Sequence, residues 1–126
     1  MDYKTDYKRV AGLGSAKKGV DHWISQRVTA VALIPLGVLF LYTFVGQIGG
    51  SYEDVLAKYS QPIPAIIALM FFLTMFRHLR LGMEVVIEDY VSNHRRQLQA
   101  LILNTLVWRA VGIIGLFAVA KIALGA

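Results

Sequence analysis

Residues 28–48 read VTAVALIPLGVLFLYTFVGQI, a run of 21 positions without a charged side chain. A helix needs about 20 apolar residues to cross the hydrocarbon core of a bilayer. Two further runs follow the same pattern: residues 59–76 are 18 positions without a charge, and residues 97–120 contain Arg109 as their only charge. The three runs together predict a chain that crosses a membrane three times as α-helices.

The composition of the 126-residue chain agrees with a membrane protein. Hydrophobic residues make up 56% and charged residues 17%, whereas soluble domains have roughly 45–50% and 25%. A soluble helical bundle is the alternative, but a bundle of this length would not need three such runs. The chain has no cysteine, which excludes disulfides and Cys-ligated zinc or iron–sulfur clusters within it. The net charge of +5 is attributed to basic residues that orient the chain in the membrane. No nucleic-acid partner is therefore expected.

Basic residues are distributed unevenly around the three runs. They are Lys4, Lys8, Arg9, Lys17, Lys18 and Arg27 before the first run, Lys58 in the first loop, Arg77, Arg80, Arg95 and Arg96 around the second loop, and Lys121 near the end. The positive-inside rule then predicts a cytoplasmic N-terminus and a periplasmic C-terminus. We expect one all-α transmembrane domain over residues 1–126, with a cytoplasmic segment at 1–26 and helices at approximately 28–48, 62–90 and 98–122.

Residues 77–90, RHLRLGMEVVIEDY, continue the second run without a proline. His78 and Gly82 lie one turn apart on one face of the expected helix. A neutral imidazole is a good iron ligand, and a glycine beside it leaves space for a flat macrocycle, so the pair favours a haem-supporting helix. The alternative is an interfacial histidine bonded to a neighbouring helix, with Gly82 as a packing contact. Because His22 and His94 lie outside the apolar runs, a second axial ligand would come from another protein chain.

Asp89 and Tyr90 end the same stretch. A phenol hydroxyl can donate a hydrogen bond to a quinone carbonyl, and a neighbouring carboxylate can orient it or relay a proton. The alternative is an interfacial tyrosine beside a solvated aspartate. Arg27 lies at the start of the first run. It is expected either to bind an anionic group such as a haem propionate or to anchor the helix at the membrane surface by snorkelling. Arg109 is interpreted as a snorkelling or helix-bundle residue.

These blocks together resemble the small cytochrome b membrane anchor of succinate dehydrogenase (succinate:quinone oxidoreductase, respiratory complex II), over nearly the whole chain. The specific part is His78-x-x-x-Gly82 followed by Asp89-Tyr90, which stand eleven and twelve residues after the histidine, as in that family. Further matches are Gly19, Val20, Arg27, Thr29 and Ala30. Residues 12–16, GLGSA, resemble the alphaproteobacterial branch. The sister anchor of the same enzyme also has His-x-x-x-Gly, but its His-Arg-x-Ser/Thr-Gly motif is absent from residues 26–30, QRVTA.

The resemblance implies roles for individual residues. His78 would be one axial ligand of a haem b whose second ligand comes from the sister anchor. Tyr90 would hydrogen-bond ubiquinone, with support from Asp89. Three further residues are expected to contact the haem: Arg27, Gly82 and His22.

The resemblance also implies a place in a larger assembly. The chain would be half of a heterodimeric anchor that holds an iron–sulfur protein and a flavoprotein at the bacterial inner membrane, or at the mitochondrial inner membrane if organellar. It would be non-catalytic on its own and would help to link the tricarboxylic acid cycle to the respiratory chain. Two other classes stay open: a small transporter or channel component with an ion path through His78, Arg77, Arg80 and Asp89, and a cofactor-free membrane adaptor. A fumarate reductase anchor is a close relative of the first hypothesis.

Overall fold

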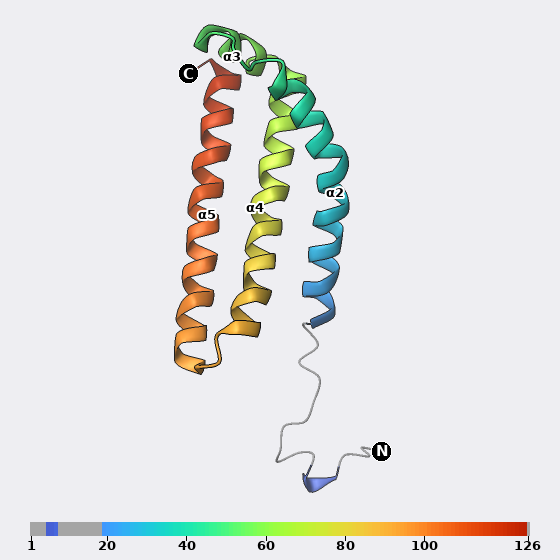
Figure 1. Ribbon diagram of the computed structural model, residues 1–126, viewed down its shortest axis with the longest axis vertical. Helices are drawn as coiled ribbons and strands as arrows, with labels where there is room; N and C mark the ends of the chain where they lie inside the picture. Colours follow the sequence, from blue (N-terminus) through green and yellow to red (C-terminus); the bar gives the residue numbers. More distant parts are fainter. Residues whose placement is uncertain (1–4, 8–18, 126) are drawn as a thin grey trace.

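Three long helices form the body of the protein. The computed structural model describes residues 5–7 and 19–125. In it α2 (Gly19–Val45), α4 (Pro62–Tyr90) and α5 (His94–Leu124) run side by side, with α4 in the middle (Figure 1). These described residues contain no strand, and all three helices are long and apolar enough to cross a membrane. The predicted all-α fold with three spans is confirmed, while the direction in which they cross stays a prediction.

The apolar runs and the helices have different limits. The ranges expected from hydropathy are 28–48, 62–90 and 98–122, yet α2 begins nine residues before the first of them, because residues 20–27 contain neither glycine nor proline. Residues 19–26 of the predicted cytoplasmic segment are therefore helical. The rest of that segment lies outside the described residues, apart from residues 5–7, and so does the GLGSA motif.

The ends of α4 and α5 follow local signals. Pro62 opens α4, where a missing backbone N–H costs little. Asn93 caps α5, since its side-chain oxygen accepts a hydrogen bond of 3.1 Å from the backbone N–H of Arg96. Gly125 follows α5 with a φ of 68°, the left-handed conformation that glycine adopts without strain.

A short helix that the hydropathy pattern did not predict connects the first two spans. This helix, α3 (Tyr52–Tyr59), begins with a capping box: Ser51 Oγ accepts from the backbone N–H of Asp54 at 3.2 Å, and Asp54 Oδ2 accepts from that of Ser51 at 2.8 Å. Hydrogen bonds from its own backbone and from the Ser51 side chain lower the pKa of the Glu53 carboxyl below its ordinary value. Helix α3 lies across the end of the bundle where α5 finishes (Figure 1).

Aromatic rings fill the space where α4 packs against its two neighbours. The rings of Phe40 on α2 and Phe71 on α4 stack with centroids 4.4 Å apart, and those of Phe76 on α4 and Trp108 on α5 are 6.2 Å apart. Gly115 lets α5 approach closely, since a Cβ there would lie only 3.2 Å from Cε2 of Phe76. Helix α4 is therefore fixed on both sides, which positions the residues of its second half.

The outer faces of α2 and α5 carry large apolar side chains. Examples that are 65% to 69% exposed are Val31, Ile34, Val38, Ile113, Ile114 and Phe117. Apolar patches of this extent mark surfaces that contact lipid or another protein.

Candidate functional site

Polar side chains line the boundary between α2 and α4. They are His22, Gln26 and Thr29 on α2, and His78, Gly82 and Glu84 on α4, a set that we call the α2–α4 seam. Intervals of four and three residues place the α2 members on one face of that helix. Each α2 member lies against one member on α4, so the seam is a row of three cross-helix pairs.

Thr29 holds His78 across the seam. Thr29 Oγ1 lies 3.0 Å from Nδ1 of His78, and it also lies 2.8 Å from the carbonyl oxygen of Ser25 and 3.0 Å from that of Gln26. The one proton of the hydroxyl can go to a backbone carbonyl or to Nδ1, so the tautomer of His78 sets the direction of the Thr29–His78 bond. With that proton on the carbonyl of Ser25, the nearest acceptor, the Nδ1–H of His78 would donate to Thr29. The lone pair of Nε2 would then be available, as metal ligation through Nε2 requires.

The outer ring nitrogen of His78 is free within the described part of the chain. Nε2 forms no hydrogen bond with residues 5–7 or 19–125, where the only bond of the ring is that to Thr29. Across these same residues, no group of three His, Asp or Glu side chains is placed to hold a metal ion. His78 therefore has one ring nitrogen that no described side chain bonds.

Gly82 lies against Gln26. A Cβ on Gly82 would lie 3.4 Å from Nε2 of Gln26, a tight contact with the end of a flexible side chain. Oε1 of Gln26 is buried and has no hydrogen-bond partner among the described residues. This acceptor lies about one turn from Thr29. A buried acceptor without a protein partner usually accepts a hydrogen bond from water, a ligand or a partner chain.

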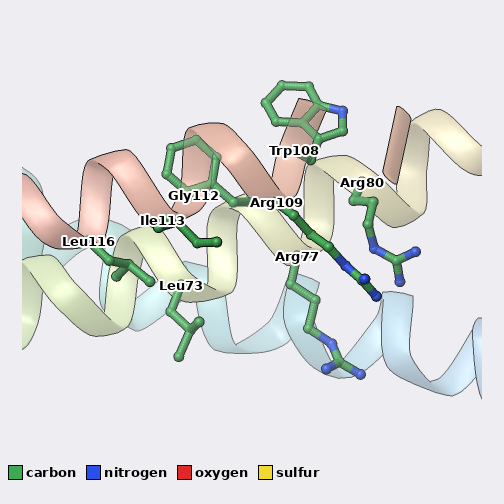
Figure 2. A pocket seen from close by; sticks show the side chains of 9 residues that line it. Leu73, Arg77, Arg80, Trp108, Arg109, Gly112, Ile113 and Leu116 are labelled. Carbon is green, nitrogen blue, oxygen red and sulfur yellow. The ribbon is translucent and has the colours of Figure 1, made fainter. Parts of the chain in front are cut away.

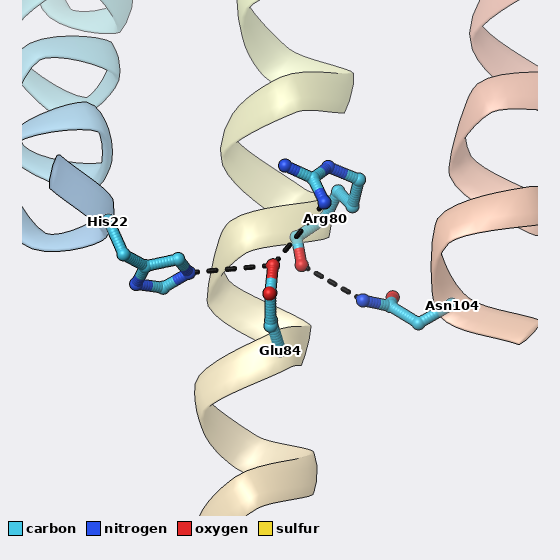
Figure 3. Close-up of polar contacts among 4 residues, drawn as sticks. All are labelled: His22, Arg80, Glu84 and Asn104. Carbon is cyan, nitrogen blue, oxygen red and sulfur yellow. Dashed lines mark hydrogen bonds and ion pairs between the residues drawn. The ribbon is translucent and has the colours of Figure 1, made fainter. Parts of the chain in front are cut away.

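His22 faces a carboxylate at the end of the seam. Its Nε2 lies 3.5 Å from Oε2 of Glu84, and Nη1 of Arg80 lies 3.3 Å from the same oxygen (Figure 3). Asn104 of α5 donates its side-chain N–H to the carbonyl oxygen of Arg80 at 3.0 Å. All three long helices are joined at this level, and His22 belongs to this polar cluster.

The other predicted site residues lie apart from the seam. Arg27 is exposed, with its guanidinium carbon 5.0 Å from the centre of the Trp23 ring. Asp89 and Tyr90 are exposed at the end of α4, and Tyr90 is 83% exposed. Tyr90 follows His78 by twelve residues, or about 18 Å along the helix axis. The structure therefore separates a histidine position inside the bundle from an aspartate–tyrosine pair at its end.

Similarity to known proteins identifies the family. The model of the succinate dehydrogenase/fumarate reductase transmembrane subunit matches residues 1–118. The chain belongs to this family. Its relatives include the succinate dehydrogenase hydrophobic membrane anchor subunit of Paracoccus denitrificans, 36% identical over 126 residues that cover 100% of this chain and 97% of the relative.

Two further relatives in the succinate dehydrogenase family match this chain over about three quarters of their own length. The hydrophobic membrane anchor subunit of Rickettsia bellii is 34% identical over 91 residues, which are 72% of this chain and 73% of the relative. The membrane anchor subunit of Reclinomonas americana is 30% identical over 90 residues, which are 69% and 75% respectively. No solved structure matches the chain significantly.

Membership in the succinate dehydrogenase anchor family confirms the resemblance that His78, Gly82, Asp89 and Tyr90 carry. Paracoccus and Rickettsia among the relatives agree with the predicted alphaproteobacterial branch. Membrane anchors as relatives, together with three helices able to cross a membrane, establish a multi-pass inner-membrane protein. The family also accounts for the exposed apolar faces of α2 and α5.

No role is predicted from the sequence for three residues that the structure brings to the site. Thr29 counts only as a match to the family, and Gln26 and Asn104 are not singled out. Signals for them exist, because His22, Gln26 and Thr29 recur at helical spacing and Asn104 is an amide within a long apolar run.

Proposed function

We propose that this succinate dehydrogenase anchor shares a haem b with the sister anchor and forms part of the ubiquinone site. The observation that carries the proposal is the Thr29–His78 hydrogen bond, because it orients the imidazole and, with Nδ1–H as the donor, would leave the Nε2 lone pair for iron. A membrane histidine held in this way is ready to ligate iron, and the sister anchor would supply the second axial ligand.

The residues around His78 fit a haem in different degrees. Thr29 would keep the Nδ1 proton in place, and Gly82, one turn further on, would add no side chain on the His78 face of α4. Arg27 has an exposed guanidinium that suits a propionate carboxylate. His22 faces Glu84, so any contact between His22 and the haem would be made from that cluster. When bound, haem b supplies a one-electron redox centre.

Tyr90 and Asp89 would serve the quinone. The Tyr90 hydroxyl would donate a hydrogen bond to a carbonyl oxygen of ubiquinone, and the bond strengthens as negative charge grows on that oxygen during reduction. Asp89, beside it in sequence, would orient the phenol or pass a proton to it. Both side chains are exposed at the end of α4, where a quinone and the neighbouring proteins of the complex would cover them.

The same end of the bundle suits the attachment of the flavoprotein and the iron–sulfur protein. Leu98, Ile102 and Leu106 are 53% to 59% exposed in the first half of α5. At this end the polar first turns of α2 and the charged second half of α4 extend beyond the charge-free run, so these apolar side chains would pack against protein. We assign this end to the cytoplasm, in agreement with the distribution of basic residues.

Purification of the complex in mild detergent tests the proposal. The tagged chain should bring down a flavoprotein, an iron–sulfur protein and a second anchor, with the absorption spectrum of a low-spin haem b. A transporter component or a cofactor-free adaptor would bring down no haem. A haem-free complex that reduces ubiquinone at the normal rate would contradict the proposal that the chain shares a haem. It would leave the role of the chain as a membrane anchor in place.

A further inference from the structure

Apart from the α2–α4 seam, a groove between α4 and α5 is lined by several cationic side chains. The groove has a volume of about 370 Å³. Leu73, Ile113 and Leu116 line its apolar part, and Arg77, Arg80 and Arg109 line its charged part. We call it the α4–α5 groove.

The three guanidinium groups come from two helices and point to one end of the groove. Figure 2 shows the side chains of Arg77, Arg80 and Arg109 extending to the same end of the groove, with the apolar side chains at the other end. Arg80 has a carboxylate partner, Glu84, at 3.3 Å. Arg77 and Arg109 have no ion pair with any residue of 5–7 and 19–125, and both are exposed. Two positive charges at the mouth of an apolar groove thus have no counterion among the residues that the structure describes.

Contacts between the helices set the depth of these charges in the membrane. The Thr29–His78 hydrogen bond puts Arg77 level with the beginning of the charge-free run at Val28. On the other side, Asn104 contacts Arg80, and Gly112 lies against Phe76, so Arg109 lies between these two levels. The charged end of the groove is therefore at the edge of the hydrocarbon layer, and its apolar end lies within that layer.

We propose that the α4–α5 groove binds one anionic phospholipid. Its phosphate would lie between Arg77 and Arg109, and one acyl chain would follow Leu73, Ile113 and Leu116 into the bilayer. Guanidinium groups pair well with phosphate oxygens, and basic pockets between membrane helices recognise anionic headgroups. This proposal rests on the membrane location of the chain and is independent of the haem and quinone assignments.

Phospholipid binding to the purified complex tests the inference. We compare the wild-type complex with Arg77→Gln/Arg109→Gln by native mass spectrometry after partial delipidation and addition of phosphatidylglycerol or phosphatidylcholine. Each basic contact with an anionic lipid is worth about 5-fold in affinity, so the double variant should bind phosphatidylglycerol about 25-fold more weakly. Phosphatidylcholine binding should not change. Arg95→Gln/Arg96→Gln, which removes two exposed cations from α5 outside the groove, should behave like wild type.

Three results would overturn the inference. They are equal phosphatidylglycerol binding by the double variant and wild type, equal affinity of wild type for both lipids, and loss of haem from the double variant without loss of lipid. The last result would assign the guanidinium groups to haem carboxylates. If the double variant does not assemble, the wild-type titration decides alone: preference for phosphatidylglycerol that weakens with salt supports the groove, and no preference contradicts it.

Discussion

At the scale of single residues, one hydroxyl bonds the imidazole of His78 across the boundary between two helices. Thr29 bonds backbone carbonyls of its own helix and His78 of the neighbouring helix at the same time. Because the hydroxyl has one proton, donation to the Ser25 carbonyl would make Thr29 an acceptor for the imidazole. Removal of this hydroxyl should change the orientation of the imidazole without removing His78 itself.

Thr29→Val should weaken haem binding while leaving the helix apolar and similar in volume. Loss of a hydrogen bond that orients a metal-ligating histidine typically lowers metal affinity by roughly 10- to 100-fold. Haem retention during dialysis and the low-spin spectrum of the complex measure the effect, and Thr29→Ser should restore both. Thr43→Val is the control, since Thr43 is 7% exposed like Thr29 but bonds Phe40 and Tyr59 at the other end of α2. Equal haem loss in both variants would mean that Thr29 acts only through helix packing.

Tyr90→Phe should slow succinate:quinone reduction and spare haem and assembly. One lost hydrogen bond costs about 0.5–1.5 kcal/mol, which is roughly 2- to 12-fold in rate. Asp89→Asn should act in the same direction by misorienting the phenol or interrupting a proton path. The control is Tyr42→Phe, an exposed tyrosine on α2. Wild-type quinone reductase activity and inhibitor sensitivity in Tyr90→Phe would make Tyr90 an interfacial anchor only.

The sequence singles out candidate site residues better than it predicts the side chains that contact them. His78 and Gly82 are identifiable from their spacing, and Asp89-Tyr90 from the family pattern. The pairing of Thr29 with His78 depends on how closely α2 and α4 approach, which no local pattern gives. For the same reason the sequence predicts open space beside Gly82 but not the side chain of Gln26, whose amide lies against this glycine.

At the scale of the helices, α4 is the element on which both candidate sites and the groove depend. Its second half faces α2 through His78 and α5 through Arg80, and its last residues carry Asp89 and Tyr90. Hydropathy predicts the three spans because lipid demands long apolar runs. It misses α3, which is short and whose start is fixed by the polar capping box at Ser51.

Ser51→Ala should loosen α3 without affecting the three spans. Loss of a helix cap costs about 1 kcal/mol, so amide exchange in α3 should quicken about 5-fold. Ser60→Ala, at the other end of α3, should change exchange less, because the Ser60 side chain bonds only the carbonyl of Ala57. The lowered pKa of Glu53 predicts that its contribution to α3 is present at neutral pH and is lost as the pH falls through that pKa. Unchanged exchange in Ser51→Ala would contradict the role of the capping box.

At the scale of the whole molecule, the three spans give the bundle two different ends. One end carries the start of α2 and the connection from α4 to α5, and the other carries α3 and the end of α5 (Figure 1). The seam, Asp89 and Tyr90 all lie toward the first end. Electrons from an iron–sulfur protein docked there would therefore reach the quinone position on that side of the membrane.

Reporter fusions test this orientation. A reporter that is active only in the cytoplasm should work when fused before Met1, and one that is active only in the periplasm should work after Ala126. The excess of basic residues around the first end of the bundle is the physical reason. The opposite pattern of activity would invert the orientation and place the candidate quinone site on the periplasmic side.

The most direct test of the account is the haem spectrum of the purified complex with His78→Leu. We predict that the low-spin haem b signal falls or disappears, while dye-linked succinate oxidation by the other proteins of the complex continues. His94→Leu, which changes an exposed histidine at the start of α5, should keep the full spectrum. An unchanged low-spin spectrum in His78→Leu would contradict the assignment of His78 as an axial ligand.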